Sequence, residues 1–465
     1  MTTPLQLTNG QIRFLRSLFP DDGCLTSPEE TLIFSTDASR LQGTPLAVVR
    51  PHDEAQIAEF FRWAQREAIP VYPRARATNV VGLCVPEHPG IVLSTLRLNR
   101  ILDVDTDDFV VETEPGVITG DLQKQVESAG LFYPPDPASL GISTIGGNVS
   151  TCAGGMRALK YGVTRDWVLG CRVVLPGGNI IECGGRNHKN VVGLDLTRLM
   201  VGSEGTLGFL SRITLKLIPK PQATGSLLAG FASMEDAMTA VRDVFRAGIL
   251  PAALEFMGPE VLSCLSLATD VPWQEAEQAG LPVRAVLLFR LDGGTEALAA
   301  DLRRLKQAIH PIWMAQGMGA EEEEPLWEVR RLINPASFLV APDKISDDVT
   351  VPRGKLLPAL TAIREIAREL RVTILTFGHV GDGNIHVNIM HTAADPEERQ
   401  RAQAAKLRVM ELVLSVQGTL SGEHGVGLTK VPYVNRQLGE EERRLMRAIK
   451  TNFDPRGIMN PGKAF

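Results

Sequence analysis

Two short segments in the second half of the chain carry side chains suited to metal chemistry. His379 and His386 lie in GHVGDGNIH, and Glu423 and His424 lie in SGEHGVG. The chain has only 8 histidines, so two this close together are notable. Two imidazoles and a carboxylate form a common catalytic metal site that keeps positions open for a substrate, and Zn²⁺ or Mn²⁺ suits such ligands. The spacing is equally compatible with polar turns whose histidines make ordinary hydrogen bonds.

The local pattern indicates how these side chains are held. The segment IHVNIM alternates in polarity as a strand does, so His386 and Asn388 are expected on the same face of that strand. Glu423 and His424 are neighbours, and in an extended chain neighbouring side chains point to opposite sides. We therefore expect one of them to reach a metal while the other faces something else.

Two loops rich in glycine, serine and threonine are candidates for holding a nucleotide. They are SLGISTIGGNVSTCAGG at 139–155 and GSEGTLG at 202–208. Glycine lets backbone N–H groups approach a pyrophosphate closely. Tight turns between strands would use the same residues, so neither loop is decisive by itself. No G-x-G-x-x-G follows a strand and no P-loop motif occurs, which disfavours a nicotinamide cofactor and P-loop chemistry.

The elements that must position these residues follow from periodicity. A short helix and a loop are expected in 5–30, and a strand–helix–strand unit begins near residue 45. Further strands are predicted at 90–95, 109–116, 171–176, 179–183 and 211–219, with a helix at 119–129 and a hairpin turn in LPGGN. The segment 131–165 shows almost no regular pattern, which is typical of a binding loop.

A boundary is predicted at 219–225, in PKPQATG. After it, strands and helices alternate, with helices expected at 234–247, 355–370, 396–416 and 440–453 and strands in SLLAGF, AALEFM, VRAVLLFRL and at 372–376. The acidic run AEEEEP at 320–325 is interpreted as a solvated turn or helix start.

Composition limits the class of protein. The chain has 465 residues and a formal net charge of −6, so two or three domains are expected and a nucleic-acid partner is not. The 6 cysteines form no C-x-x-C pair, which indicates reduced thiols in a cytoplasmic protein. We expect no signal peptide and no transmembrane segment. Peripheral association with the inner membrane through a partner stays open.

Several long motifs together resemble the FAD-linked oxidases of the vanillyl-alcohol-oxidase type. The first is YPPDPASLGISTIGGNVSTCAGGMRALKYGVTRDWVLG at 133–170, and NVVGLDLTRLMVGSEGTLGFLSRITLKLIPKP at 190–221 continues it. GHVGDGNIHVN, SGEHGVGLTK and FDPRGIMNPGKAF resemble the branch that contains D-lactate dehydrogenases, D-2-hydroxyglutarate dehydrogenases and the flavin subunit of glycolate oxidase. The resemblance covers about residues 35–465.

This resemblance implies an α+β fold. It implies an FAD-binding domain of PCMH type with two subdomains, followed by a cap domain with an antiparallel sheet flanked by helices. The domains expected are an N-terminal helix and lead-in at 1–40, the FAD-binding domain at 41–220, a substrate or cap domain with metal ligands at 221–420, and a C-terminal segment that returns to the flavin at 421–465.

The resemblance also implies the cofactor site. The expected FAD-binding residues are Arg74, Ala75, Arg76, Ala77, Thr78, Asn79, Pro135, Ser139, Thr144, Gly146, Gly147, Asn148, Gly154, Glu204, Gly205, Gly208 and Asn460. One departure stands out: the family's first phosphate loop usually reads Pro-Arg-Gly-Ala-Gly-Thr, and here Ala75 and Ala77 replace two glycines and Arg76 intrudes. If those positions need positive φ, each alanine costs about 1 kcal/mol. Arg76 either pairs with the pyrophosphate or points into solvent. The loop offers no histidine or cysteine tether, so FAD is expected to bind noncovalently.

By the same resemblance, His379, His386 and Glu423 are the metal ligands and His424 is the catalytic base. Arg330 and Lys344 would hold the substrate carboxylate, and Asn388 would join the catalytic group. The expected reaction oxidises a D-2-hydroxy acid, with D-lactate and glycolate favoured. Without cluster-type cysteines, electrons must leave to an iron–sulfur subunit, an electron-transfer flavoprotein, a cytochrome or a quinone.

Two other interpretations stay open. The altered phosphate loop favours a noncatalytic FAD-fold subunit of a larger oxidoreductase complex, and a flavin enzyme acting on an aryl alcohol is the third. The set of histidines and Glu423 weighs against both. A homodimer or a subunit of a complex is equally compatible with the sequence.

Overall fold

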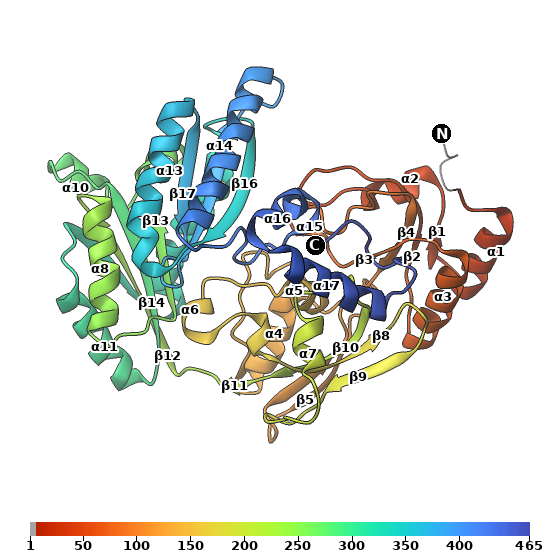
Figure 1. The fold of residues 1–465 in the computed structure, drawn as a ribbon. Helices are drawn as coiled ribbons and strands as arrows, with labels where there is room; N and C mark the ends of the chain where they lie inside the picture. The colour runs from red at the N-terminus through yellow and green to blue at the C-terminus, as the bar shows by residue number, and fades with distance from the viewer. Residues whose placement is uncertain (1–5) are drawn as a thin grey trace. The chain divides into compact units, whose positions relative to one another are not determined.

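The computed structural model describes residues 6–465, and within them the chain forms two compact units. The first unit consists of residues 6–155, Gly162–Lys220 and Glu423–Phe465, and the second consists of Met156–Tyr161 and Pro221–Gly422. Each unit is a mixture of helices and strands with its own sheets (Figure 1). This agrees with the predicted α+β class.

The first unit contains two main sheets. A four-stranded sheet has the order β1-β2-β4-β3, formed by Cys24–Leu25, Pro45–Val49, Gly90–Ser94 and Val71–Arg74. β2 and β3 both run parallel to β4, because α3 (Glu54–Glu67) returns the chain between β2 and β3. α3 buries Ile57, Phe60, Phe61 and Trp63 in a core shared with that sheet. The predicted strand–helix–strand unit at 45–75 is confirmed.

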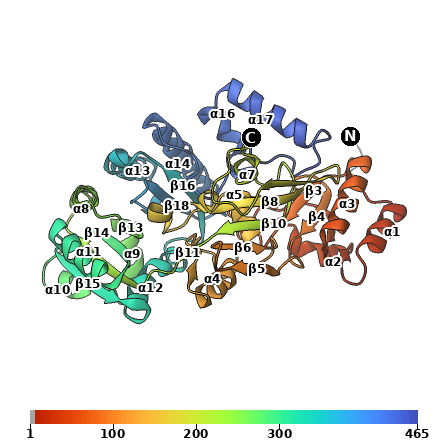
Figure 2. The same ribbon diagram turned by 90° about the horizontal axis from the view of Figure 1, so that it is seen from below.

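The other main sheet of this unit is antiparallel. Its order is β5-β6-β10-β8-β9, formed by Ile101–Asp105, Val110–Thr113, Phe209–Lys216, Val168–Val174 and Ile180–Gly184 (Figure 2). The hairpin between β8 and β9 closes through the hydrogen bond from Gly178 N–H to the Leu175 carbonyl, at the predicted turn. A two-stranded ribbon pairs β7 (Leu131–Phe132) with β11 (Ile218–Pro219), and helix α4 spans Thr119–Ser128.

The segment 131–165 is more regular than predicted. It contains α5 (Ile145–Thr151) and α6 (Ala158–Tyr161). Two glycines make IGGNVST a weak helix former. Tertiary contacts hold it instead: the Thr144 side chain caps Gly147 N–H, and a Cβ on Gly146 would lie 2.8 Å from the Pro115 carbonyl oxygen. Propensity alone could not reveal this helix.

The second unit is built on one seven-stranded antiparallel sheet. Its order is β15-β12-β14-β13-β17-β18-β16, formed by Trp313–Met318, Ala223–Phe231, Ala285–Gly293, Ala253–Met257, Thr373–Gly378, Asn384–His391 and Asp343–Thr350. Alternate residues face opposite sides: Leu227 packs into one core and Leu228 into the other. The predicted antiparallel sheet flanked by helices is confirmed.

Helices cover both faces of this sheet. One face packs against α8 (Met234–Arg246), α11 (Thr295–Ala308), α13 (Leu356–Leu370) and α14 (Pro396–Ser415), which Figure 1 shows beside the strands. The other face packs against α9 (Pro259–Ala268), α10 (Gln274–Gln278) and α12 (Gly319–Ser337). The sequence analysis did not predict α9 to α11 or strands β5, β15 and β16, and for α12 it offered only a turn or helix start at 320–325.

The acidic run lies in the first turns of α12, and its interpretation as solvated is wrong for one of its residues. The helix begins at Gly319, but Glu323 is only 2% exposed and pairs with Arg290 of β14. Because Glu323 lies on the inner face of the helix, its side chain is buried, unlike those of the other three consecutive glutamates. Charge composition does not show which glutamate that is, because only helix phase relative to the sheet decides it.

Two short helices precede the C-terminal tail. They are α15 (Gly427–Lys430) and α16 (Val434–Gln437), and α17 (Glu440–Phe453) follows them. No helix among residues 6–465 is both long and apolar enough to cross a membrane.

Candidate functional site

An open cavity lies within the first unit. Three parts of the chain form most of its wall: residues 73–80, 137–154 and 204–210. The two loops predicted to hold a nucleotide, far apart in sequence, therefore meet at one cavity. Of the seventeen predicted cofactor residues, fifteen line it: Arg74, Ala75, Arg76, Ala77, Thr78, Asn79, Ser139, Thr144, Gly146, Gly147, Asn148, Gly154, Glu204, Gly205 and Gly208.

The two other predicted cofactor residues lie outside the lining. The Pro135 carbonyl accepts a hydrogen bond from Gln123 Nε2 at 2.8 Å. Asn460 Nδ2 donates to the carbonyls of Glu204, at 2.7 Å, and Leu83, at 3.2 Å. Asn460 thus ties the C-terminal tail to two residues of the wall, and its buried Oδ1 has no hydrogen-bond partner among the described residues.

Glu204 fastens the wall to the segment that follows His424. Its carboxylate accepts the N–H of Val426 at 2.5 Å and of Gly427 at 3.0 Å. Burial raises the pKa of this carboxyl, while the two N–H donors act in the opposite direction. The side chain predicted to lie near the cofactor is therefore also a structural clamp.

The altered phosphate loop is strained at one of its two alanines. Ala77 has φ +54°, in the left-handed region, whereas Ala75 is not among the residues with positive φ. The expected conformational cost therefore applies to Ala77 alone. Arg74 lines the cavity, but its guanidinium donates to the carbonyls of Thr36, at 2.7 Å, and Ile33, at 3.2 Å, and Arg76 is exposed.

The cavity wall offers a bound cofactor small residues and a few polar groups. Small residues allow close approach: a Cβ on Gly147 would already contact Ala75 at 3.4 Å. The hydroxyl of Thr95 is buried at the wall and has no hydrogen-bond partner among the described residues, so it can bind a ligand. Cys84 also lines the wall, and burial raises the pKa of its thiol to about 11. It is protonated at neutral pH and is a poor nucleophile for a flavin.

Glu423 and His424 line the same cavity, which corrects the expectation of opposite sides. Oε1 of Glu423 lies 3.9 Å from Nε2 of His424. The reason is local: the segment is a series of bends rather than a strand, so the two-residue alternation of side chains does not apply.

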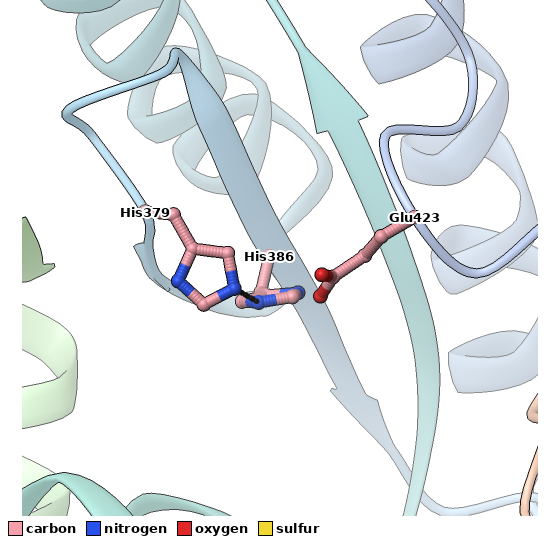
Figure 3. Close-up of side chains that lie close together, drawn as sticks. All are labelled: His379, His386 and Glu423. Carbon is pink, nitrogen blue, oxygen red and sulfur yellow. Dashed lines mark hydrogen bonds between the residues drawn. The ribbon is translucent and has the colours of Figure 1, made fainter. Parts of the chain in front are cut away.

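The second unit brings the two histidines together at the turn between β17 and β18. Their Nε2 atoms are 3.4 Å apart and their rings are nearly perpendicular (Figure 3). Gly378, with φ +147°, makes the turn possible, since a Cβ there would lie 2.7 Å from the Asn384 carbonyl oxygen. One ligand atom from each of His379, His386 and Glu423 lies within 4.8 Å of the others, as Figure 3 shows. This donor set, two imidazoles and a carboxylate, is the one that suits Zn²⁺ or Mn²⁺.

A glutamate that the sequence reading missed holds this turn. Glu255 of β13 is fully buried and contacts His379 Nδ1 through Oε1 at 2.5 Å and Arg330 Nε through Oε2 at 2.7 Å. Burial raises the pKa of the Glu255 carboxyl, but the facing charges of His379 and Arg330 outweigh burial and lower its pKa to about 2. The available signal was an acidic residue inside the apolar run AALEFM.

The remaining predicted catalytic residues lie on the same unit. Lys344 Nζ donates to Ser337 Oγ at 3.2 Å and lies over the Phe338 ring at 4.7 Å. Asn388 Oδ1 accepts from Ser346 Oγ at 2.8 Å, across the β16–β18 ladder. Ile385, Val387 and Ile389 of β18 all pack into one core, so the predicted alternation of this strand is confirmed and His386 and Asn388 share the opposite face.

Comparison with known proteins identifies the family. Residues 45–184 match the family model described as FAD binding domain, and residues 220–464 match that of FAD linked oxidases, C-terminal domain. The chain belongs to the FAD-linked oxidases. It is 40% identical to the glycolate oxidase subunit GlcD of Bacillus subtilis, with 93% of this chain and 92% of that protein covered.

Two other relatives carry different names. A D-lactate dehydrogenase of Anaerostipes hadrus is 34% identical, with 92% of each chain covered, and a D-2-hydroxyglutarate dehydrogenase of Stutzerimonas stutzeri is 33% identical, with 97% and 98% covered. Among solved structures, p-cresol methylhydroxylase shares the fold with a TM-score of 0.80 at 16% identity, covering 99% of this chain and 98% of that one. The chain is therefore an FAD-linked oxidoreductase of the type that these relatives represent.

Proposed function

We propose that this chain oxidises a D-2-hydroxy acid, with D-lactate or glycolate favoured, to the 2-oxo acid. The observation that carries the proposal is the combination of a cavity lined by the predicted cofactor residues with the His379, His386 and Glu423 cluster. Relatives named for glycolate, D-lactate and D-2-hydroxyglutarate support the substrate class.

The cofactors proposed are noncovalent FAD and a divalent metal, Zn²⁺ or Mn²⁺. FAD supplies acceptance of a hydride from C2 of the substrate, and the metal supplies Lewis acidity that lowers the pKa of the 2-hydroxyl. The chain's own residues perform the remaining steps. His424 takes the hydroxyl proton as general base, for which an imidazole is suited at neutral pH.

Arg330 and Lys344 bind and orient the substrate carboxylate, and Asn388 contributes a polar group on the face that carries His386. The Glu255 contact fixes the Nε edge of Arg330, so its terminal nitrogens are the ones available to a carboxylate. Electrons then pass to a partner, which we propose to be an iron–sulfur subunit, an electron-transfer flavoprotein, a cytochrome or a quinone. A cytoplasmic location, with peripheral membrane association through that partner, and a homodimer or larger complex are parts of the same proposal.

The test is an anaerobic reduction experiment. The purified protein is assayed for flavin and metal, then mixed in turn with D-lactate, L-lactate, glycolate and D-2-hydroxyglutarate. Bleaching of the flavin absorbance by a D-acid or glycolate, lost on chelation, is the expected result. His424→Ala should slow the bleaching by about 100- to 10,000-fold, whereas the control His310→Ala, at an exposed histidine of the second unit, should not.

One observation favours the noncatalytic alternative, namely the left-handed Ala77 in the phosphate loop. A protein that cannot be reconstituted with FAD would establish that alternative and refute the enzyme. Recovery of FAD binding in Ala77→Gly would then identify the loop as the cause.

A further inference from the structure

We infer that Glu255 is a positioning residue that orients a metal ligand and a substrate-binding arginine at once, so that metal affinity and substrate affinity depend on one carboxylate. The inference rests on the function proposed above. Nothing in the motifs that define the site includes Glu255, which lies on β13, more than a hundred residues before His379.

The first argument is that both carboxylate oxygens are committed. Oε1 lies 2.5 Å from Nδ1 of His379, and Oε2 lies 2.7 Å from Nε of Arg330. Glu255 is fully buried, so water does not compete for either oxygen. A carboxylate accepts hydrogen bonds, so Nδ1 carries a proton, and in the neutral imidazole that a metal binds this leaves the lone pair on Nε2. Nε2 is the nitrogen that faces His386, and a carboxylate behind an imidazole fixes ring orientation for a metal.

The second argument is that the contacts close into a ring of five side chains. The Arg330 guanidinium lies over the Phe377 ring, 4.8 Å from its centre. Phe377 packs on His386 with 5.1 Å between ring centres, and His386 packs on His379 at 5.0 Å. Glu255 joins the two ends, His379 and Arg330. A change in the carboxylate therefore disturbs the imidazoles and the guanidinium together.

The experiment compares Glu255→Gln with the wild type. A glutamine presents an oxygen to one partner and an N–H to the other, so either His379 or Arg330 loses its acceptor. The dissociation constants of Zn²⁺ and Mn²⁺ are measured without substrate, by competition with a chromophoric chelator. We expect affinity to fall by about 10- to 100-fold, and KM for the hydroxy acid to rise. Unchanged metal affinity in the variant overturns the inference.

Glu323→Gln is the matched control. Glu323 is a second buried glutamate of this unit and also pairs with an arginine, but it contacts no histidine. Its metal dissociation constants should equal those of the wild type. An equal loss of metal affinity in both variants would show a general effect of disturbing a buried carboxylate and would overturn the specific role.

Two further outcomes keep the hypotheses separate. If the wild type binds neither metal, the proposed metal site fails, and this inference with it. If the wild type binds metal and Glu255→Gln binds it with the same affinity, this inference alone fails. Should Glu255→Gln not fold, Glu255→Asp keeps the charge that faces Arg330 but shortens the reach to Nδ1. It should lose metal affinity in the same direction, and wild-type affinity there overturns the inference.

Discussion

The second unit contains two buried glutamate–arginine pairs that are built alike. Glu255 binds Arg330 Nε at 2.7 Å, and Arg330 stacks on Phe377 at 4.8 Å. Glu323 binds Arg290 Nε at 3.1 Å, and Arg290 stacks on Trp327 at 5.8 Å. Both carboxylates are removed from water, at 0% and 2% exposure. By composition and burial the two clusters would be given the same role.

What separates the clusters is the partner of the other carboxylate oxygen. Oε1 of Glu323 accepts from the hydroxyl of Thr224, while Oε2, which faces Arg290, also accepts from the hydroxyl of Ser226, and Ser226 accepts from Trp327 Nε1 at 2.8 Å. None of these three donors is a predicted metal ligand or a predicted substrate-binding residue. Glu255 contacts an imidazole, which has a second nitrogen on its far side. The same buried pair therefore stabilises packing in one place and supports a candidate metal ligand in the other.

The largest difference between the clusters should appear when a metal ligand is removed. His386→Ala should lower the rate of anaerobic flavin reduction about 1000-fold, the equivalent of about 4 kcal/mol in the barrier. Stopped-flow absorbance measures this rate. Glu323→Gln should keep the wild-type rate per folded molecule. A slow Glu323→Gln enzyme would remove the functional distinction between the two clusters.

The next effect is on stability. Glu323→Ala removes the buried carboxylate that faces the half-buried guanidinium of Arg290, which should cost about 3 kcal/mol in the free energy of unfolding. Urea unfolding followed by circular dichroism measures it. The neighbouring Glu324→Ala removes an exposed pair with Arg331 and should cost less than about 1 kcal/mol. Similar losses in the two variants would contradict the buried role of Glu323.

A smaller effect is expected at the tryptophan of the Glu323 cluster. Trp327→Phe removes the donor to Ser226 while keeping an aromatic ring under Arg290, so the free energy of unfolding should fall by about 1–2 kcal/mol. The metal dissociation constants should not change. A shift in metal affinity in this variant would show that the two clusters are energetically coupled. The contacts described above share no residue between the clusters, so no coupling is expected.

Lys463, a buried cation of the first unit, can be compared with the two buried arginine–glutamate pairs. Its hydrogen bond goes to a carbonyl rather than to a carboxylate. Lys463 Nζ donates to the Val85 carbonyl at 2.9 Å, and burial lowers its pKa to about 8. The unfolded chain, with a lysine pKa near its ordinary value of 10.5, binds more protons above pH 8. The Lys463 contribution to stability should therefore rise by about 1 kcal/mol between pH 8 and pH 9. In Lys463→Met this increment should disappear from urea unfolding curves, and an unchanged pH slope would contradict the lowered pKa.

Local patterns predicted most elements of the first unit, such as β2–α3–β3, and the family resemblance implied the antiparallel sheet of the second unit. They failed where tertiary contacts outweigh propensity, as in the glycine-containing helix α5. They also failed where strand alternation was assumed for a bent segment, at Glu423 and His424. Motif positions selected fifteen residues that do share one cavity wall.

The sequence by itself determined which imidazoles, carboxylates and small-residue loops exist. It also determined that His386 and Asn388 lie on the same face of β18. Only the tertiary structure decided which of two similar buried glutamates stands behind a histidine. Hydrogen bonding across a sheet joins residues such as Glu255 and His379 that are distant along the chain. Strand order and helix phase set those pairings, and neither is encoded in the local periodicity of a segment.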